Sequence, residues 1–201
     1  MNRGERSLRV IGGRLRGRTW RFPEAPGLRP TPDRVRETLF NWLQMRIAGV
    51  RCLDAFAGSG ALGIEALSRG ASHVAFCESN ARAAADLRDT LTRFGIAEQA
   101  RVHVGEVPSA LQGLQGGPFD VVFVDPPFAA GLVASTLAAL AGQHLLAEEA
   151  FVYVELPADE AVPALPAGWA AHRQGRAGEV GYHLLTVSSR RADAPNPQGV
   201  P

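Results

Sequence analysis

The sequence predicts an α/β fold in which a mostly parallel β-sheet is covered by helices on both faces. From residue 51 onward, short apolar runs typical of strands alternate with helical segments several times. These runs are continuously apolar, which indicates strands that are buried on both sides. At 201 residues the chain has the size of one ordinary domain with a small appendage.

Residues 1–30 are predicted to form a basic β-hairpin arm. Between Leu8 and Phe22, apolar and basic residues alternate on either side of a glycine-rich turn. Residues 1–36 contain ten arginines and three acidic residues, although the whole chain carries a net charge of only +1. Basic side chains neutralise phosphates and release counterions, so this distribution favours a nucleic-acid partner. An ordinary solvated surface is the alternative interpretation.

A helix is predicted after the proline- and glycine-bearing connection at residues 23–30. Thr31 is expected to cap this helix, with Pro32 in its first position and Gly49 at its end. One apolar stripe has helical spacing and predicts the buried face: Val35, Leu39, Phe40, Leu43 and Ile47.

The remainder, residues 31–187, is predicted to be one domain built on the strand-helix repeat. Strands are expected at 51–56, 73–78, 101–104, 119–124 and 151–155, and helices at 61–69, 81–94, 108–114 and 132–140. Two further strands, 169–176 and 180–187, flank a short glycine-containing connection that favours antiparallel pairing. Residues 188–201 are polar and proline-rich, and we expect a disordered tail.

Several other classes of protein are disfavoured. No stretch approaches the roughly 18 apolar residues of a membrane span, and the amino terminus lacks the apolar segment of a secretory signal, so we expect a cytoplasmic protein. Cys52 and Cys77 lie inside predicted strands and are expected to be buried thiols. The histidines have no ligand spacing, so no metal site is expected. Ser59 lacks the flanking pattern of a hydrolase nucleophile.

The strand-to-helix junction at residues 54–60 predicts a cofactor site. Glycines in such a junction let the backbone approach a ligand closely, and open parallel sheets bind ligands there. Glu78 ends the next strand, where it could accept hydrogen bonds from two ribose hydroxyls, so an adenosine-containing cofactor is predicted. Glu106 follows the third strand and is placed near the adenine, although a helix cap is an equally good interpretation. The predicted cofactor residues here are Asp54, Phe56, Ala57, Gly58, Gly60, Glu78 and Glu106.

The segment Asp125-Pro126-Pro127-Phe128 directly follows the most apolar strand and predicts a reaction site. Two prolines cannot extend a strand ladder, so they form a stiff loop at the edge of the sheet. An aromatic amine is a poor nucleophile, but acceptors for its hydrogens restore its nucleophilicity. Asp125 and a neighbouring carbonyl supply the acceptors, and Phe128 supplies a stacking face. Methylation of a nucleobase amino group is therefore predicted, with a rigid surface turn as the alternative.

Together these residues resemble the RsmD family of bacterial 16S ribosomal RNA guanine-N2 methyltransferases. The resemblance covers roughly residues 8–187 and rests on Ile11–Arg14 with Arg16–Arg18, Gly27–Thr31, Asp33–Trp42, Asp54–Gly63 and Val122–Phe128. It implies a Rossmann-like class I methyltransferase fold, with a mostly parallel seven-stranded sheet and a C-terminal antiparallel strand. It also implies S-adenosylmethionine as cofactor and a guanine of 16S ribosomal RNA as substrate.

The resemblance further implies roles for the amino-terminal residues. The segment matching 29–41 packs over the cofactor and the base, so Thr31 is expected at the cofactor, with Arg34 and Glu37 beside it. Glu106 departs from the aspartate more usual in the family. We expect a monomer that acts on 16S RNA, within a small subunit or its assembly intermediate, without a membrane or a metal. The arginines expected to bind RNA are Arg9, Arg14, Arg16, Arg18, Arg29 and Arg34.

Two alternative functions stay open on the residues alone. An adenine-N6 methyltransferase acting on DNA or RNA would use the same loop chemistry, because the loop suits either amino group. A non-catalytic RNA-binding assembly factor could retain the fold and the cofactor pocket. The amino-terminal match favours guanine over adenine.

Overall fold

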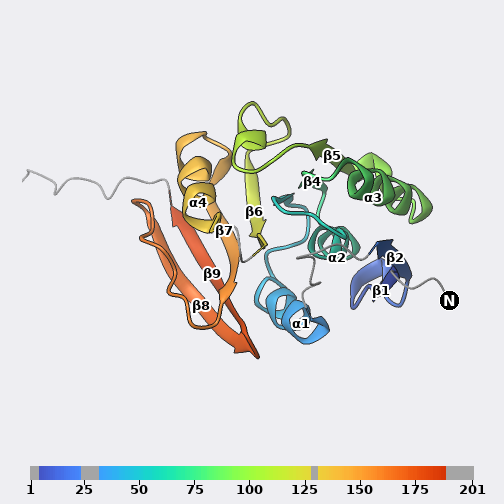
Figure 1. The fold of residues 1–201 in the computed structure, drawn as a ribbon, viewed down its shortest axis with the longest axis horizontal. Coiled ribbons are helices and arrows are strands. Elements are labelled where there is room, and N and C mark those ends of the chain that lie inside the picture. The colour runs from blue at the N-terminus through green and yellow to red at the C-terminus, as the bar shows by residue number, and fades with distance from the viewer. Residues whose placement is uncertain (1–4, 24–31, 128–130, 189–201) are drawn as a thin grey trace, which may run out of the picture.

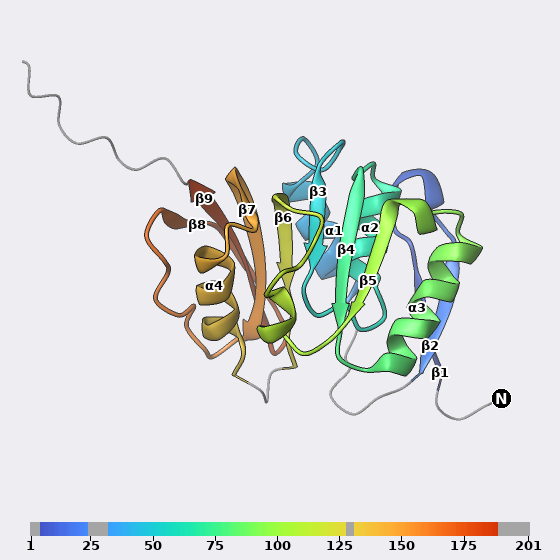
Figure 2. The same ribbon diagram turned by 90° about the horizontal axis from the view of Figure 1, so that it is seen from above.

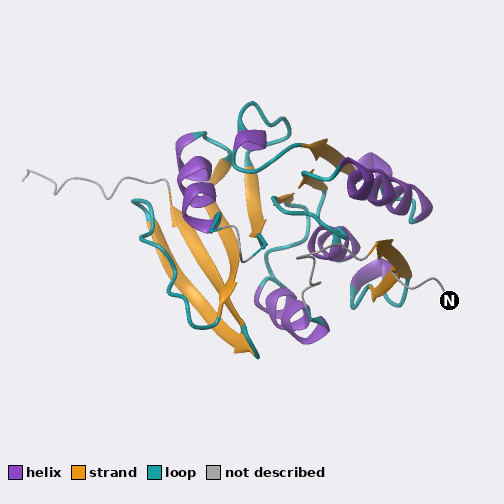
Figure 3. Cartoon of the chain, in the orientation of Figure 1, coloured by secondary structure: helices purple, strands orange, loops and turns teal. Residues whose placement is uncertain are grey.

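The computed structural model describes residues 5–23, 32–127 and 131–188, in which a seven-stranded sheet has helices on both faces (Figures 1, 2 and 3). Strand β9 runs antiparallel to its neighbours β7 and β8, and every other adjacent pair is parallel. The predicted sheet with a C-terminal antiparallel strand is therefore confirmed. In spatial order the strands are β5 (Ala100–Val104), β4 (His73–Glu78), β3 (Arg51–Asp54), β6 (Phe119–Val124), β7 (Leu146–Pro157), β9 (Val180–Ser188) and β8 (Trp169–Ala177).

The helices divide between the two faces of the sheet. Helices α1 (Asp33–Trp42), α2 (Ala61–Ser68) and α3 (Ala81–Arg93) share one core cluster, and α4 (Val133–Gly142) packs on the opposite face (Figure 1). Successive side chains of a strand point to opposite faces. Accordingly Phe123 of β6 packs in the first core and Val122 and Val124 pack in the second.

The amino-terminal hairpin consists of β1 (Glu5–Arg9) and β2 (Thr19–Pro23), which pair antiparallel. The predicted hairpin is confirmed; its glycine-rich connection runs from residue 10 to residue 18 and contains the short 3-10 helix η1 (Gly13–Leu15). Leu8, Trp20 and Phe22 are buried, and their neighbours Arg9, Thr19 and Arg21 in the two strands are exposed. The hairpin thus has an apolar face that packs beside α2 and α3 and an arginine-rich outer face (Figure 1).

Four elements differ from the sequence-based expectation. Helix α1 begins at Asp33, after an extended Pro32 at the N-cap, and ends at Trp42. Tighter hydrogen bonds of the 3-10 type continue through Arg46, so Leu43 and Ile47 still reach the core. The helix predicted at 108–114 is only the 3-10 turn η3 (Ser109–Leu111). A second 3-10 turn, η2 (Ala97–Gln99), precedes β5. Strand β7 extends well beyond 151–155, because β9 pairs with nine of its residues.

The two cysteines lie in the central strands, as predicted. Cys52 in β3 and Cys77 in β4 are buried free thiols. Burial, with Asp54 nearby, raises the pKa of Cys77 to about 12. No helix in the described ranges is long and apolar enough to cross a membrane. Thr31, Arg29, Phe128 and the tail beyond residue 188 lie outside the described residues.

Candidate active site

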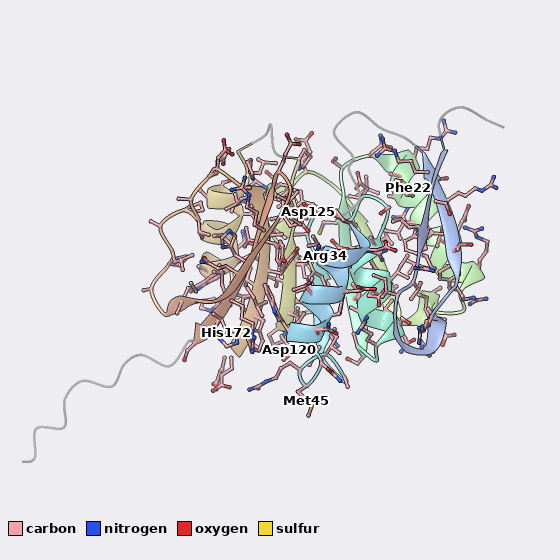
Figure 4. The ribbon with its side chains drawn as sticks, turned by 90° about the horizontal axis from the view of Figure 1, so that it is seen from below. Phe22, Arg34, Met45, Asp120, Asp125 and His172 are labelled. Atoms are coloured by element: carbon pink, nitrogen blue, oxygen red, sulfur yellow. The ribbon has the colours of Figure 1, made fainter. Side chains whose placement is uncertain are left out.

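The predicted site lies where the strand order reverses between β3 and β6. From β3 the chain proceeds outward to β4 and β5, whereas β6 leads the other way to β7. Crevices at the carboxyl ends of strands beside such a reversal are where open α/β sheets bind ligands. Asp54 ends β3, and Asp125 follows directly after β6. Figure 4 shows Asp125 at this edge and Asp120 toward the opposite end of β6.

The loop between Asp54 and α2 lies at this edge of the sheet. Gly58 and Gly60 have φ values of 50° and 78°, in the left-handed region that glycine adopts without a steric penalty. The loop is fastened to neighbouring strands, because Ala55 N donates to Phe123 O (3.0 Å) and Ala57 N to Cys77 O (2.8 Å). The loop is therefore held firmly, with Gly58 half-buried and Gly60 buried against Leu87 and Ile64.

Two carboxylates support this loop from within the protein. Asp54 is buried and accepts a hydrogen bond from Gly63 N of α2 at 3.0 Å, so it fixes the first turn of that helix. Glu78 is half-buried and accepts from Gly58 N and Asn80 N, each at 2.7 Å. A carboxylate offers about four acceptor positions, so Glu78 retains the capacity to accept from two ribose hydroxyls. The sequence predicted its place but not its hydrogen bond to Gly58.

The carboxylates at this edge influence one another electrostatically. The pKa of Asp54 is raised to about 7, chiefly by burial and also by Asp125 and Glu78, while the hydrogen bond from Gly63 N acts to lower it. The described part of the site therefore concentrates negative charge at the loop. Such a site favours a ligand that carries positive charge.

The raised pKa of Asp54 predicts a pH dependence of stability. The folded protein holds a proton that the unfolded chain, with a pKa of 3.8, has already released, so stability falls as the pH rises from about 4 to 7. The free energy of unfolding should fall by at most about 1.4 kcal/mol for each pH unit on account of this residue. Urea unfolding at pH 5 and pH 7 should show a smaller loss of stability in Asp54→Asn than in the unmodified protein. Equal losses in the two proteins would contradict the assignment.

The proline loop forms one wall of a pocket beside this edge. Asp125 is half-buried, Pro126 is buried and Pro127 is exposed. Pro126 and Pro127 line the pocket together with Leu132 and residues at the start of α4 and the end of β7. The predicted loop is therefore in place beside a concave surface, as far as Pro127.

Sequence reasoning did not single out Glu155, which lies next to this loop. Val124 and Val154 are register partners in β6 and β7, so Asp125 and Glu155 follow at equivalent positions. Glu155 is buried, lines the same pocket and accepts a hydrogen bond from the Tyr153 hydroxyl at 2.7 Å. Burial, together with Glu155 and Asp125, raises the pKa of Tyr153 well above its usual value. The sequence does carry a signal for Glu155, because this glutamate ends the otherwise apolar strand predicted at residues 151–155.

Glu106 is placed at the exposed end of β5. Its side chain is exposed, and η3 after it has Pro108 at its N-cap with no side-chain hydrogen bond. The alternative interpretation of Glu106 as a helix cap is therefore wrong.

The described members of the predicted RNA-binding set are all exposed. Arg9, Arg14, Arg16 and Arg18 lie on the hairpin and Arg34 on α1. Arg14 donates to Gln99, and Arg18 donates to Phe94 O at 3.0 Å with its guanidinium 4.8 Å from the centre of the Phe94 ring. Arg18 therefore also anchors the hairpin to the end of α3, which the sequence did not predict.

Comparisons with known proteins agree with this architecture. The model of the family described as Conserved hypothetical protein 95 matches residues 8–186. Ribosomal RNA small subunit methyltransferase D of Escherichia coli K12 is 46% identical over 181 residues, which is 90% of each chain. The solved structure of the yhhF protein of Escherichia coli has a TM-score of 0.82 and 44% identity, over 92% of this chain and 99% of that one.

A more distant solved structure shares the fold alone. It is an RNA methyltransferase from Salinibacter ruber in complex with S-adenosyl-L-homocysteine, with a TM-score of 0.62 and 15% identity over 83% of this chain and 98% of that one. The fold is therefore that of class I methyltransferases. With a family model that spans most of the sequence and a relative of 46% identity, the chain belongs to the Conserved hypothetical protein 95 family, the RsmD family of small-subunit ribosomal RNA methyltransferases.

Proposed function

We propose that this protein transfers a methyl group from S-adenosylmethionine to the exocyclic N2 amino group of a guanine in 16S ribosomal RNA. The observation that carries the proposal is the position of Asp125-Pro126-Pro127, which adjoins the Asp54–Gly60 loop across the reversal between β3 and β6. Relatives named ribosomal RNA small subunit methyltransferase D support ribosomal RNA as the substrate class. In this proposal residues 1–30 contribute RNA binding and residues 31–187 the methyl transfer.

The residues of the loop fit the cofactor. Glu78 is already oriented by Gly58 N and has acceptor capacity for the ribose hydroxyls, and the half-buried backbone at Gly58 lacks a side chain that would block close contact. The acidic edge formed by Asp54, Glu78 and Asp125 suits a cationic ligand. When bound, S-adenosylmethionine supplies a methyl group attached to a positively charged sulfur, and this methyl is transferred as the nitrogen–carbon bond forms and the sulfur–carbon bond breaks.

Asp125 orients and activates the amino group in this account. Its carboxylate accepts a hydrogen bond from the amine, which keeps the nitrogen lone pair directed toward the cofactor side of the edge. Pro126 has no N–H, so the loop offers no competing donor at that position. As the amine gains a methyl group it becomes acidic, and Asp125 accepts the proton that the nitrogen loses.

The outer face of the hairpin is proposed to hold the RNA backbone. The double substitution Arg14→Ser with Arg16→Ser should weaken RNA binding and lower the slope of log affinity against log salt by about two units, one for each lost phosphate contact. Filter binding across a salt series measures the slope. The matched control is Arg173→Ser with Arg176→Ser on β8, at the opposite end of the sheet from the hairpin (Figure 1). Equal slopes for the two double variants would refute this role of the hairpin.

The substrate class is tested by incubating the protein with radiolabelled S-adenosylmethionine and small ribosomal subunits, naked 16S RNA or DNA. Incorporation into subunits or 16S RNA, with none into DNA, is the expected result. Incorporation into DNA, or binding of RNA with no methyl transfer to any substrate, would contradict the proposed function.

A further inference from the structure

The cofactor loop is held by a side chain from the amino-terminal hairpin. The indole N–H of Trp20 in β2 donates a hydrogen bond to the carbonyl of Ser59 at 2.9 Å. Trp20 is only 3% exposed, and Ser59 lies between the two left-handed glycines of the loop. These residues are 39 positions apart in the chain. The contact therefore joins two segments to which different tasks are assigned.

The Gly58-Ser59-Gly60 segment depends on such external contacts for its conformation. Glycines have a wide range of backbone conformations, so a Gly-Ser-Gly segment is intrinsically mobile. Glu78 holds the Ala57–Gly58 peptide through Gly58 N at 2.7 Å, and Trp20 holds the Ser59–Gly60 peptide through the Ser59 carbonyl. The N–H of this Ser59–Gly60 peptide also donates from Gly60 to Ala57 O at 2.6 Å, so the peptide has one described contact at each end. Loss of the indole N–H removes the contact at the carbonyl end and lets the Ser59 carbonyl change its orientation.

The hairpin that carries Trp20 is attached to helices α2 and α3 by several contacts. The Trp20 ring packs edge-on against Phe94 at 6.1 Å between centroids, and Arg18 donates to the Phe94 carbonyl. On the other side, Glu65 of α2 accepts from Ile11 N and Gly12 N, both at 2.8 Å. Because these contacts hold the hairpin as one unit, we expect a movement of its exposed arginine face to move Trp20 as well.

We propose that Trp20 is a positioning residue that couples RNA binding on the hairpin to cofactor binding in the loop. RNA that holds the hairpin in its docked position stabilises the Trp20–Ser59 contact, and this contact orders the loop for the cofactor. Coupling of this kind is reciprocal, so the cofactor increases RNA affinity by the same factor as RNA increases cofactor affinity. The RNA half of the proposal rests on the proposed function; the cofactor half does not.

The substitution Trp20→Phe removes the N–H and keeps an aromatic ring in the core. We expect the dissociation constant for S-adenosylhomocysteine to rise by about 3- to 10-fold, as for the loss of one buried hydrogen bond. The increase in cofactor affinity that RNA causes in the unmodified protein should fall to less than about twofold, against the roughly fivefold or more typical of allosteric coupling. At saturating RNA, KM for S-adenosylmethionine should rise while kcat stays nearly constant.

Trp42→Phe is the matched control. Trp42 at the end of α1 packs on the Tyr182 ring at 5.5 Å, away from the loop, and should leave cofactor affinity and coupling unchanged. Calorimetric titration with and without RNA gives both quantities for each variant. Cofactor affinity and coupling in Trp20→Phe that match those of Trp42→Phe would overturn the proposal.

A second measurement keeps the Trp20 hydrogen bond intact. The chain has three tryptophans, so the double variant Trp42→Phe with Trp169→Phe reports Trp20 fluorescence alone. S-adenosylhomocysteine and RNA should each change the emission of Trp20. The change caused by both ligands together should differ from the sum of the two separate changes. An emission that does not respond to the cofactor would overturn the proposal. Failure of the unmodified protein to bind RNA would instead refute the proposed function, and the response of Trp20 to the cofactor alone would still test this contact.

Discussion

Asp125→Ala is expected to lower the rate of methyl transfer by roughly 10²- to 10³-fold, the usual effect of removing one group that stabilises a transition state. Asp125 is half-buried after β6, and its proposed hydrogen bond is with the amino group. The affinities for RNA and S-adenosylhomocysteine should stay within about twofold, because hairpin arginines and the Gly58–Glu78 pair are proposed to supply them. Single-turnover rates at saturating cofactor measure the loss.

Two further variants make this result specific. Asp125→Asn keeps an acceptor oxygen and should retain more activity than Asp125→Ala. Asp159→Ala removes an exposed carboxylate from the connection after β7 and should leave the rate unchanged. If Asp125→Ala lost RNA binding and kept its single-turnover rate, the loop would be an RNA contact and not the reaction site.

Glu65→Ala should destabilise the protein by about 3–5 kcal/mol, the cost of removing one partner from a buried ionic network. Glu65 has a fully buried carboxylate that accepts from Ile11 N, Gly12 N and Arg69 Nε, and it lies 3.7 Å from Nη1 of the buried Arg36. Its removal leaves two backbone N–H groups and the Arg69 guanidinium without this acceptor, and it leaves the buried Arg36 without the opposite charge of this carboxylate. For a domain of this size the melting temperature should fall by about 10 °C.

The same substitution should loosen the hairpin before the rest of the fold. Amide hydrogen exchange at Ile11 and Gly12 should accelerate, and RNA affinity should fall because the arginine face is no longer held in place. Glu98→Ala, which removes an exposed carboxylate from η2, is the control and should change stability by less than about 0.5 kcal/mol. A melting temperature of Glu65→Ala equal to that of the control would show that the network does not hold the hairpin.

The elements that the sequence predicted well have strong local patterns. Strand β6 is bounded as expected, because an unbroken apolar run meets two prolines that cannot join a ladder. Glu78 follows the same logic, since the end of an apolar strand locates the edge of the sheet. Both predictions needed only the apolar run that indicates a strand and the residues that end this run.

The contacts that tie the hairpin to the site could not be predicted in this way. Alternation along residues 8–22 indicated which side chains are apolar, but not that Trp20 would reach Ser59 or that Glu65 would cap Ile11 and Gly12. These pairs are separated by 39, 54 and 53 residues, so their proximity depends on how the hairpin docks on α2 and α3. Propensity and periodicity carry no information about such packing.

The decisive measurement for guanine-N2 methylation is the identity of the methylated atom. Small subunits methylated with isotopically labelled S-adenosylmethionine are digested to nucleosides and analysed by mass spectrometry. We expect the label to appear as N2-methylguanosine and to be lost in Asp125→Ala. Label in N6-methyladenosine, or in a base methylated on a ring atom, would contradict guanine-N2 methylation.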